Sequence, residues 1–169
     1  MDRRTIVTDR LTLSPITWDD AENMAVLHAD ARVMSNLKHG PLDRAASDAL
    51  VADYEAEWNA FGFGSWTARE RAGGALVGYG GLRVHDGGYG IALRAAFTPE
   101  AQGKGYGPEL GRAAVTWAFE VAGVPRVVAI TRGSNIPGQR SLEKFGMRRA
   151  RAWTTGDGRD LLLYVLDRP

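Results

Sequence analysis

Hydrophobic and polar residues alternate near the start of the chain and then recur at helical spacing. Leu11 to Pro15 alternates and ends at a proline, which predicts a short strand. A helical repeat then runs to His28, with Thr17 or Asp19 as its N-terminal cap. A weaker helical repeat covers Ala45 to Ala60. The first third of the chain therefore predicts one strand followed by two helices.

Three strand-like segments separated by glycine-rich turns come next. They are Phe63 to Arg69, Ala75 to Val84 and Tyr89 to Phe97. Gly73-Gly74 lies between the first two, and Asp86-Gly87-Gly88 precedes the third. Both short segments are typical of hairpin turns, because glycine adopts the positive φ angles that such turns require. We therefore expect these strands to form hairpins.

The second half of the chain alternates between helices and strands. Apolar residues at helical spacing predict a helix over Glu109 to Ala122, and the apolar run Val124 to Ile130 predicts a strand. Pro137 to Phe145 is predicted to be the last helix, followed by closing strands over Arg148 to Thr154 and Asp160 to Leu166. Because a helix separates strand 124–130 from the strand before it, we expect these two strands to be near neighbours in parallel.

Composition narrows the class of protein. The 169 residues are 44% hydrophobic and 24% charged, carry a formal net charge of +1 and include no cysteine. So small a net charge is a poor basis for binding nucleic acid, and the lack of cysteine excludes disulfides, thiolate metal sites and a cysteine nucleophile. No apolar run reaches the roughly 20 residues of a membrane span, and the N-terminus lacks the apolar core of a signal peptide. We therefore expect one soluble, cytoplasmic domain over residues 1–169 that binds neither nucleic acid nor a membrane.

The segment Gln102 to Gly107 lies between a predicted strand and a predicted helix and carries glycines at alternate positions. Free N–H groups and the dipole at a helix start form an anion site, and glycine lets successive N–H groups point inward. Pro108 suits the first helical position because it has no N–H, and Lys104 either meets a phosphate or is solvated. A tight turn that binds nothing is the other interpretation. Neither the Walker motif nor the dinucleotide motif Gly-x-Gly-x-x-Gly is present.

Four segments resemble the GNAT superfamily of N-acetyltransferases. Gln102-x-x-Gly105-x-Gly107 is similar to its acetyl-CoA signature, and Asn135 to Met147 resembles its Asn-led helix that ends in Glu-Lys-x-Gly-Phe/Met. Thr8 to Pro15 and Val77 to Leu82 are similar to segments of the RimJ/RimL-type branch, which contains the ribosomal-protein N-terminal acetyltransferases. The likeness extends from about Thr8 to Val165 in the expected order.

The resemblance implies the GNAT fold, an α/β (α+β) arrangement. Its sheet is mixed, mostly antiparallel and splayed between two central parallel strands, here Tyr89 to Phe97 and Val124 to Ile130, with helices on both faces. The pantetheine arm of acetyl-CoA, the expected co-substrate, enters that gap, and no metal is expected. By this resemblance the cofactor contacts are backbone groups of Ala96, Phe97 and Thr98, the pyrophosphate loop Gln102, Gly103, Lys104, Gly105, Tyr106 and Gly107, and Asn135. A cap of the following helix is the other interpretation of Asn135.

The catalytic half of the site departs from the family. The strand Tyr89 to Phe97 holds no carboxylate that would deprotonate an amine. Leu142 stands where many members have a tyrosine acid, and Gly138 stands where the RimJ/RimL branch has a serine. Ser141 is the nearest hydroxyl but lies nearly one helical turn further along. Ser141 and Asn135 are therefore the candidates for catalysis, and Ser141 is alternatively an ordinary helix-surface serine.

The lack of a carboxylate base affects which acceptor amine is favoured. A lysine amine with a pKa near 10.4 needs about 4 kcal/mol to be presented uncharged at neutral pH, whereas an α-amine near 7.8 needs less than about 1 kcal/mol. A site without a nearby carboxylate therefore favours an α-amine such as a peptide N-terminus. A water chain or a base from elsewhere in the chain stays open. The candidate bases are Asp86, Glu100, His28, His39, His85 and, less readily than a role in the first turn of its helix, Glu109.

The leading hypothesis is direct transfer of acetyl from acetyl-CoA to a primary amine in a ternary complex. The amine belongs to a peptide N-terminus or to a small molecule. A catalytically silent acyl-CoA-binding module is the alternative, because Leu142 and Gly138 stand where polar groups are expected. A third hypothesis is an interaction domain without a cofactor. Both a monomer and a homodimer stay open.

Overall fold

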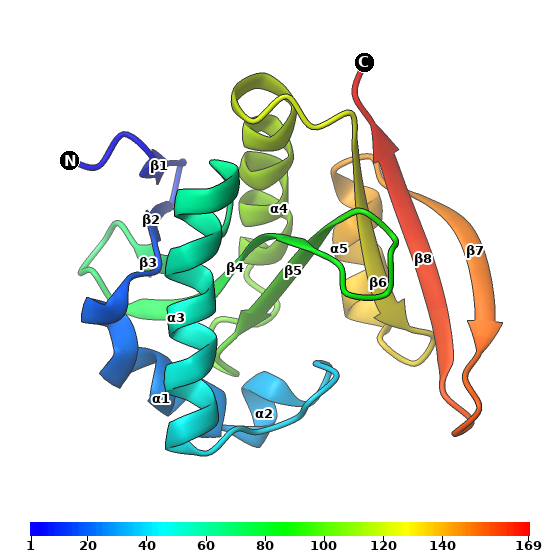
Figure 1. The fold of residues 1–169 in the computed structure, drawn as a ribbon, viewed down its shortest axis with the longest axis horizontal. Helices are drawn as coiled ribbons and strands as arrows, with labels where there is room; N and C mark the ends of the chain where they lie inside the picture. The colour runs from blue at the N-terminus through cyan, green and yellow to red at the C-terminus, as the bar shows by residue number, and fades with distance from the viewer.

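A computed structural model describes all residues, 1–169, and shows an eight-stranded sheet in the order β1-β2-β3-β4-β5-β6-β8-β7 (Figure 1). The strands are β1 (Ile6–Val7), β2 (Leu11–Pro15), β3 (Ser65–Glu70), β4 (Leu76–Val84), β5 (Ile91–Phe97), β6 (Arg126–Arg132), β7 (Arg148–Thr154) and β8 (Asp160–Asp167). Neighbouring strands are antiparallel except for β5 and β6, which are parallel. This mixed, mostly antiparallel sheet confirms the predicted fold class.

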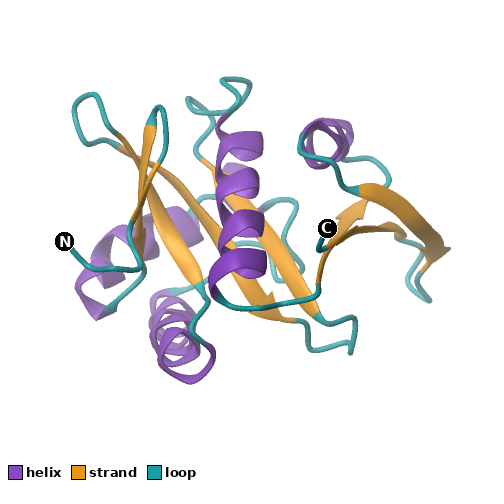
Figure 2. Cartoon of the chain, turned by 90° about the horizontal axis from the view of Figure 1, so that it is seen from above, coloured by secondary structure: helices purple, strands orange, loops and turns teal.

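Helices cover both faces of this sheet, as Figures 1 and 2 show. The helices are α1 (Ala21–Ala29), α2 (Ala31–Met34), α3 (Arg44–Phe61), α4 (Tyr106–Thr116) and α5 (Ile136–Lys144), with a 3₁₀ turn η1 (Trp18–Asp20) and a π-helical turn η2 (Trp117–Val121). One hydrophobic cluster packs α4 against the sheet, and a second packs α1, α2 and α3 against the other face. None of the helices has both the length and the hydrophobicity needed to cross a membrane.

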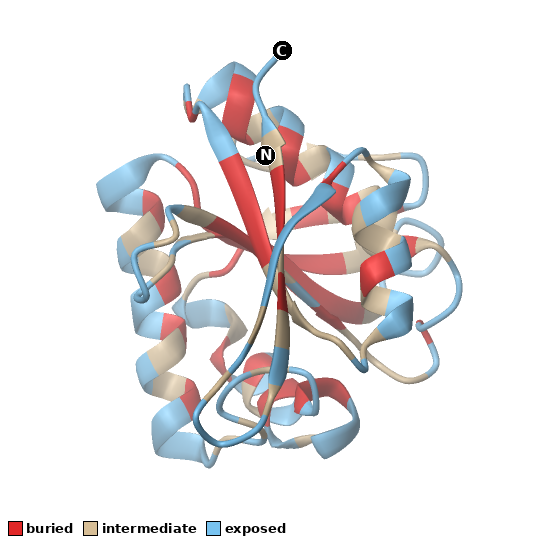
Figure 3. Ribbon diagram, turned by 90° about the vertical axis from the view of Figure 1, so that its right-hand side faces the viewer, coloured by how far each residue is buried: buried red, intermediate tan, exposed pale blue.

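The buried residues lie mainly along the centre of the sheet. In Figure 3 the buried segments run along the central strands and the inner sides of the helices. Trp66 on β3 and Tyr164 on β8 are fully buried, whereas nearly all of β7 at the edge of the sheet is exposed. Trp58 and Trp66 pack edge to face with their ring centroids 4.8 Å apart. Trp58 and Trp66 are therefore core residues.

The parallel pair at the centre of the sheet separates after two residue pairs. Only Ile91 and Ala92 of β5 pair with Val127 and Val128 of β6, although both strands continue for several residues. Beyond Ala92 the edge of β5 that faces β6 has no strand partner. This divergence opens the sheet between the end of β5 and the start of α5.

Glycines on β4 allow β5 to lie unusually close. A Cβ added at Gly78 would lie 2.4 Å from the carbonyl oxygen of Ala96, and one added at Gly80 would lie 2.6 Å from that of Arg94. Real Cβ atoms do not approach backbone oxygens so closely, because van der Waals repulsion rises steeply at such distances. The glycines of the Val77 to Leu82 segment therefore set the position of the strand that lines the gap.

Several predicted boundaries differ from the observed ones, and the largest differences are in α4. The helix expected from Glu109 begins at Tyr106, so Pro108 occupies its third position instead of its first. This position tolerates proline equally well, because the N–H groups of the whole first turn lack helical partners. The helix expected to continue to Ala122 changes to a π-helical turn at Trp117. The short elements β1 and α2 were not predicted, because two to four residues are too few to show a period.

Candidate active site

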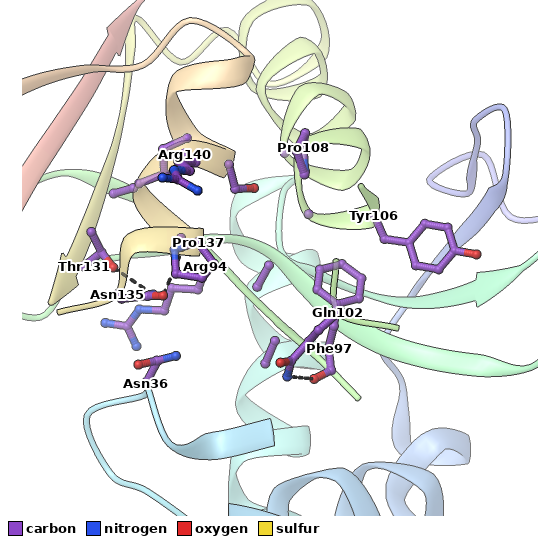
Figure 4. A pocket seen from close by; sticks show the side chains of 18 of the residues that line it. Asn36, Arg94, Phe97, Gln102, Tyr106, Pro108, Thr131, Asn135, Pro137 and Arg140 are labelled. Carbon is purple, nitrogen blue, oxygen red and sulfur yellow. Dashed lines mark hydrogen bonds between the residues drawn. The ribbon is translucent and has the colours of Figure 1, made fainter. Parts of the chain in front are cut away.

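A cavity of about 560 Å³ lies where β5 and β6 diverge. Its walls come from the second half of β5, the glycine-rich loop with the start of α4, the end of β6, α5, and the segment 32–37 that spans the end of α2. Figure 4 shows these side chains converging from segments far apart in the sequence. Most of the residues that the sequence analysis selected line this one cavity; Thr98 and Lys104 do not.

The glycine-rich loop presents a row of free backbone donors. The N–H groups of Gly103 through Gly107 donate to no carbonyl or side chain of the protein. Gly103 has φ of +76° and Gly105 has φ of +84°, left-handed conformations in which residues other than glycine are strained. Because α4 begins at Tyr106, its dipole adds positive potential at the same place. Five successive donors at a helix start are the arrangement that binds a phosphate or pyrophosphate.

The loop is held in shape from the N-terminal segment. Arg10 Nη1 donates to the carbonyl oxygen of Lys104 at 2.7 Å, and the Arg10 guanidinium lies over the Tyr106 ring. This hydrogen bond holds the Lys104 carbonyl oxygen toward Arg10. The Lys104 ammonium lies 3.8 Å from Glu70, whose carboxylate also accepts a hydrogen bond from the Tyr106 hydroxyl. The charge of Lys104 is thus directed toward Glu70.

Glu109 anchors this N-terminal segment to α4. Its carboxylate accepts hydrogen bonds from the Thr8 hydroxyl at 2.6 Å and from the Arg10 backbone N–H and Nε, both at 2.8 Å. Burial acts to raise the pKa of Glu109, but these hydrogen bonds outweigh it and hold the pKa below its ordinary value. Glu109 does not line the cavity. Its position supports a structural role, which links Thr8 and Arg10 of the N-terminal motif to the loop.

Asn135 caps α5. Its Oδ1 accepts the backbone N–H of Gly138 at 3.1 Å, and its Nδ2 donates to the Thr131 hydroxyl at 3.1 Å (Figure 4). The side chain thereby connects the end of β6 to the start of the last helix. A Cβ at Gly138 would lie 2.3 Å from Asn135 Nδ2. A side chain at Gly138 would therefore require the Asn135 amide to move.

Backbone groups at the end of β5 divide between the sheet and the cavity. Thr98 donates its N–H to Val77, and its carbonyl accepts from Ala101 and Gln102, so its backbone groups are bonded within the chain. In an antiparallel pair these hydrogen bonds alternate, which directs the Ala96 backbone groups toward β4 as well. The backbone groups of Phe97 face the other way, and the Phe97 carbonyl accepts a hydrogen bond from the Gln102 side chain at 3.1 Å.

Ser141 lies where α4 and α5 meet. A Cβ at Gly107 would lie 2.8 Å from Ser141 Oγ, and one at Gly111 would lie 2.5 Å from the Phe145 ring. The two helices pack closely because α4 has glycine at both positions. The Ser141 hydroxyl lines the cavity beside the glycine-rich loop and makes no hydrogen bond within the chain.

The charges around the cavity are of one sign. No aspartate, glutamate or histidine lines it, whereas four cationic side chains do. The candidate bases lie elsewhere: burial lowers the pKa of the enclosed His28 to about 4, and His85 Nδ1 accepts the Gly87 N–H. The cationic residues are Arg32, Arg94, Arg140 and Lys144. Sequence patterns did not single out these residues, although an arginine within the apolar segment Ile91 to Phe97 was an available signal.

Comparison with known proteins gives a consistent family. Residues 10–148 match the family model described as the acetyltransferase (GNAT) domain. The chain is 26% identical over 144 residues to the uncharacterized N-acetyltransferase YnaD of Bacillus subtilis (strain 168), and this match covers 85% of the chain and 82% of YnaD.

Solved structures share the fold over nearly the whole chain. An acetyltransferase of Agrobacterium tumefaciens (strain C58) is 24% identical with a TM-score of 0.85, and the match covers 99% of this chain and 96% of that one. AAC(6')-Ib in complex with paromomycin and acetyl-CoA is 21% identical with a TM-score of 0.78, over 95% and 94% of the two chains. Because the family model matches most of the chain, the protein belongs to the GNAT family and is an acetyltransferase.

Proposed function

We propose that the protein transfers the acetyl group of acetyl-CoA to a primary amine, with an α-amine as the favoured acceptor. The observation that carries this proposal is the row of five free N–H groups from Gly103 to Gly107 at the mouth of a cavity lined only by cationic charges. Acetyl-CoA supplies an acetyl group activated as a thioester and carries several phosphate charges. A polyanion of this kind is the ligand that the loop and the cavity charges favour.

In this proposal the glycine-rich loop, the end of β5 and α5 each contact a different part of acetyl-CoA. We assign the pyrophosphate to the N–H groups of Gly103 to Gly107, with Gln102 securing the end of β5. Phe97 offers its backbone to the pantetheine arm, and Asn135 shapes the wall opposite. We place Ser141 at the cofactor end, because its hydroxyl faces the glycine-rich loop. Thr98 is left out, since its backbone groups are bonded within the chain.

The lack of a base in the cavity selects the acceptor. No carboxylate or imidazole lines the cavity, so an ammonium that enters must lose its proton to water or before binding. An α-amine with a pKa near 7.8 does so at a cost below about 1 kcal/mol at neutral pH, whereas a lysine amine needs about 4 kcal/mol. The surrounding cations favour the neutral amine further, because like charge disfavours the ammonium form.

We place the protein nearest to the RimJ/RimL-type branch of the family. The support is the Thr8 to Pro15 segment, in which Thr8 and Arg10 both bond to Glu109. These residues form one connected unit that secures the cofactor loop. Similarity in these residues supports a shared way of holding acetyl-CoA. It says less about the identity of the acceptor.

The test of the proposed function follows free thiol during incubation with acetyl-CoA. The acceptors are N-terminal peptides, polyamines and aminoglycosides, and calorimetry with CoA is run in parallel. We expect CoA to bind and at least one α-amine peptide to be acetylated faster than any acceptor with only side-chain amines. CoA binding without turnover on any acceptor would establish a silent acyl-CoA-binding module, and the absence of CoA binding would overturn the assignment of the loop.

Arg10 provides a prediction about the cofactor loop. Arg10→Met removes the bond to the Lys104 carbonyl and the ion pair with Glu109, so the loop loses part of its preorganisation and CoA affinity falls. Because Arg10 is half-exposed and solvent screens its charge, we expect a loss of about 5-fold, less than a buried charged hydrogen bond provides. Calorimetric titration with CoA measures the change.

Arg71 supplies the matched control for this variant. It donates to the carbonyls of Thr8 and Asp9 and thus holds the same N-terminal segment, but it does not contact the loop. Arg71→Met should keep the affinity for CoA near that of the unmodified protein. Equal losses in the two variants would show that Arg10 acts through the N-terminal segment and does not position the loop.

A further inference from the structure

Arg94 lies on the face of β5 opposite to the glycine-rich loop. Side chains alternate along a strand, and Leu93 belongs to the hydrophobic cluster that contains α4, whereas Ala96 belongs to the cluster of α1, α2 and α3. Arg94 shares the face of Ala96. The free N–H groups of the loop are at the start of α4, on the other face. Arg94 therefore lies at the end of the cavity away from the proposed phosphate site.

Three polar side chains define this end of the cavity. In Figure 4 the side chain of Arg94 lies between those of Asn36 and Asn135. All three line the cavity, and they come from the segment after α2, from β5 and from the start of α5. The amide of Asn135 is bonded to Thr131 and Gly138, whereas Asn36 makes no side-chain hydrogen bond within the chain. We refer to Asn36, Arg94 and Asn135 as the acceptor end.

Arg94 is a partly buried guanidinium without an anionic partner. It makes no ion pair within 4 Å, and its side chain donates no hydrogen bond within the protein. Arg83 on the adjacent strand has the same side chain at a similar depth, and it forms an ion pair with Glu57 at 2.7 Å. Half-buried guanidinium groups normally have such partners, because burying an unpaired charge is unfavourable. Arg94 therefore differs from Arg83 in having no anionic partner.

No acidic group of the chain lies within ion-pair distance of Arg94, and the nearest one that feels its charge is Asp86. The cavity lining contains no carboxylate. Asp86, the acidic residue of the turn before β5, is exposed and lies 3.7 Å from Lys38 and 3.6 Å from His85. The guanidinium offers five N–H donors in a planar fork that matches a carboxylate. An anion that arrives with the substrate is the partner that this geometry lacks.

We infer that the acceptor amine carries a carboxylate and that Arg94 binds it. This inference rests on the proposed function and names the substrate class of the same cavity. The carboxylate belongs either to the amino acid itself, as a free α-carboxylate, or to the side chain of an acidic first residue of a peptide. A polycationic acceptor such as an aminoglycoside is disfavoured, because it meets Arg94 and no acidic side chain.

Acceptor pairs that differ in one charge test this inference, with each compound compared at the same concentration of neutral amine. Alanine and alaninamide test the α-carboxylate; Asp-Ala-Ala amide and Asn-Ala-Ala amide test the side-chain carboxylate; Lys-Ala-Ala amide and paromomycin are the cationic members. In at least one pair we expect the carboxylate member to have a kcat/KM about 30-fold above its neutral partner, as a charged bidentate contact provides. Calorimetry of the same compounds with the CoA-loaded protein measures binding independently of turnover.

Substitutions of Arg94 identify the group responsible. Arg94→Met should lower kcat/KM and affinity for the carboxylate acceptor by about 30-fold, and should affect the neutral partner and CoA affinity much less, because Arg94 lies away from the proposed phosphate site. Arg94→Lys should keep part of the preference, because it retains the charge without the fork. Arg94→Glu should shift the preference to Lys-Ala-Ala amide. The control is Arg112→Met, which makes the same charge change at an exposed position on α4 outside the cavity and should change none of these values.

The possible outcomes separate this inference from the proposed function. If neutral acceptors react as well as carboxylate acceptors, or Arg94→Met changes nothing, the inference is wrong and the acetyltransferase function stands. If no acceptor releases thiol but carboxylate amines bind in a manner that depends on Arg94, the inference holds and the proposed turnover fails. If there is neither turnover nor binding, both are wrong.

Discussion

Gly105→Glu is expected to weaken CoA binding by at least about 100-fold, as measured by calorimetry. Gly105 has φ of +84°, so any side chain there is strained by roughly 1–2 kcal/mol. An added Cβ would lie 3.3 Å from Arg10 Nη2, the residue that holds the Lys104 carbonyl. The carboxylate would also compete with the pyrophosphate for the free N–H groups and repel it. Each of these effects acts against the same ligand.

Gly158→Glu is the matched control for this variant. Gly158 has φ of +83° in the exposed turn between β7 and β8, and nothing lies within 4 Å of its added Cβ. The control therefore has nearly the same backbone strain and the same added charge without the anion site. We expect its affinity for CoA to equal that of the unmodified protein. A similar loss of affinity in both variants would contradict the placement of the pyrophosphate.

Acid should destabilise the fold through His28. The imidazole is fully buried; its Nδ1 lies 2.8 Å from the Ser47 hydroxyl, and its Nε2 has no partner. Burial lowers the pKa of His28 from 6.5 to about 4. The rings beside it are Tyr54 and Tyr79, and burial raises the pKa of Tyr54 to about 12. Both neighbours are therefore neutral throughout the acid range.

The lowered pKa sets the direction and the pH window of this effect. Between pH 6.5 and 4 the unfolded chain binds a proton at His28 and the folded protein does not, so the free energy of unfolding decreases as the pH falls. Its stabilising contribution is complete above pH 6.5, and the loss reaches about 3 kcal/mol near pH 4. Urea unfolding at several pH values across this range measures the loss.

His28→Gln separates the contribution of His28 to the free energy of unfolding from that of carboxylates that titrate in the same pH range. The variant should lose the part of the pH dependence between 6.5 and 4, whatever its stability at pH 7. His39→Gln serves as the control, because His39 is exposed in the loop before α3 and should leave the dependence unchanged. A pH dependence in His28→Gln equal to that of the unmodified protein would show that His28 does not cause the acid loss.

Local sequence patterns predicted most of the fold because strands and helices bury one face. The alternation in Leu11 to Pro15 and the segment Arg148 to Thr154 correspond to β2 and β7 with the same bounds. Long elements with a hydrophobic face were found within a few residues. The start of α4 was misplaced because Pro108 is a common first residue of a helix and is also tolerated at its third position.

Sequence by itself determined the glycine-rich loop, because φ angles near +80° at Gly103 and Gly105 are a local property that glycine supplies. The order of the motifs around it determined the family. Only the tertiary structure decided how the side chains are used. The bond from Arg10 to Lys104, and the unpaired position of Arg94, depend on segments far apart in the sequence, and no local period records such contacts. Residue type and spacing thus predicted the glycine-rich loop, and folding decided which side chains line the rest of the cavity.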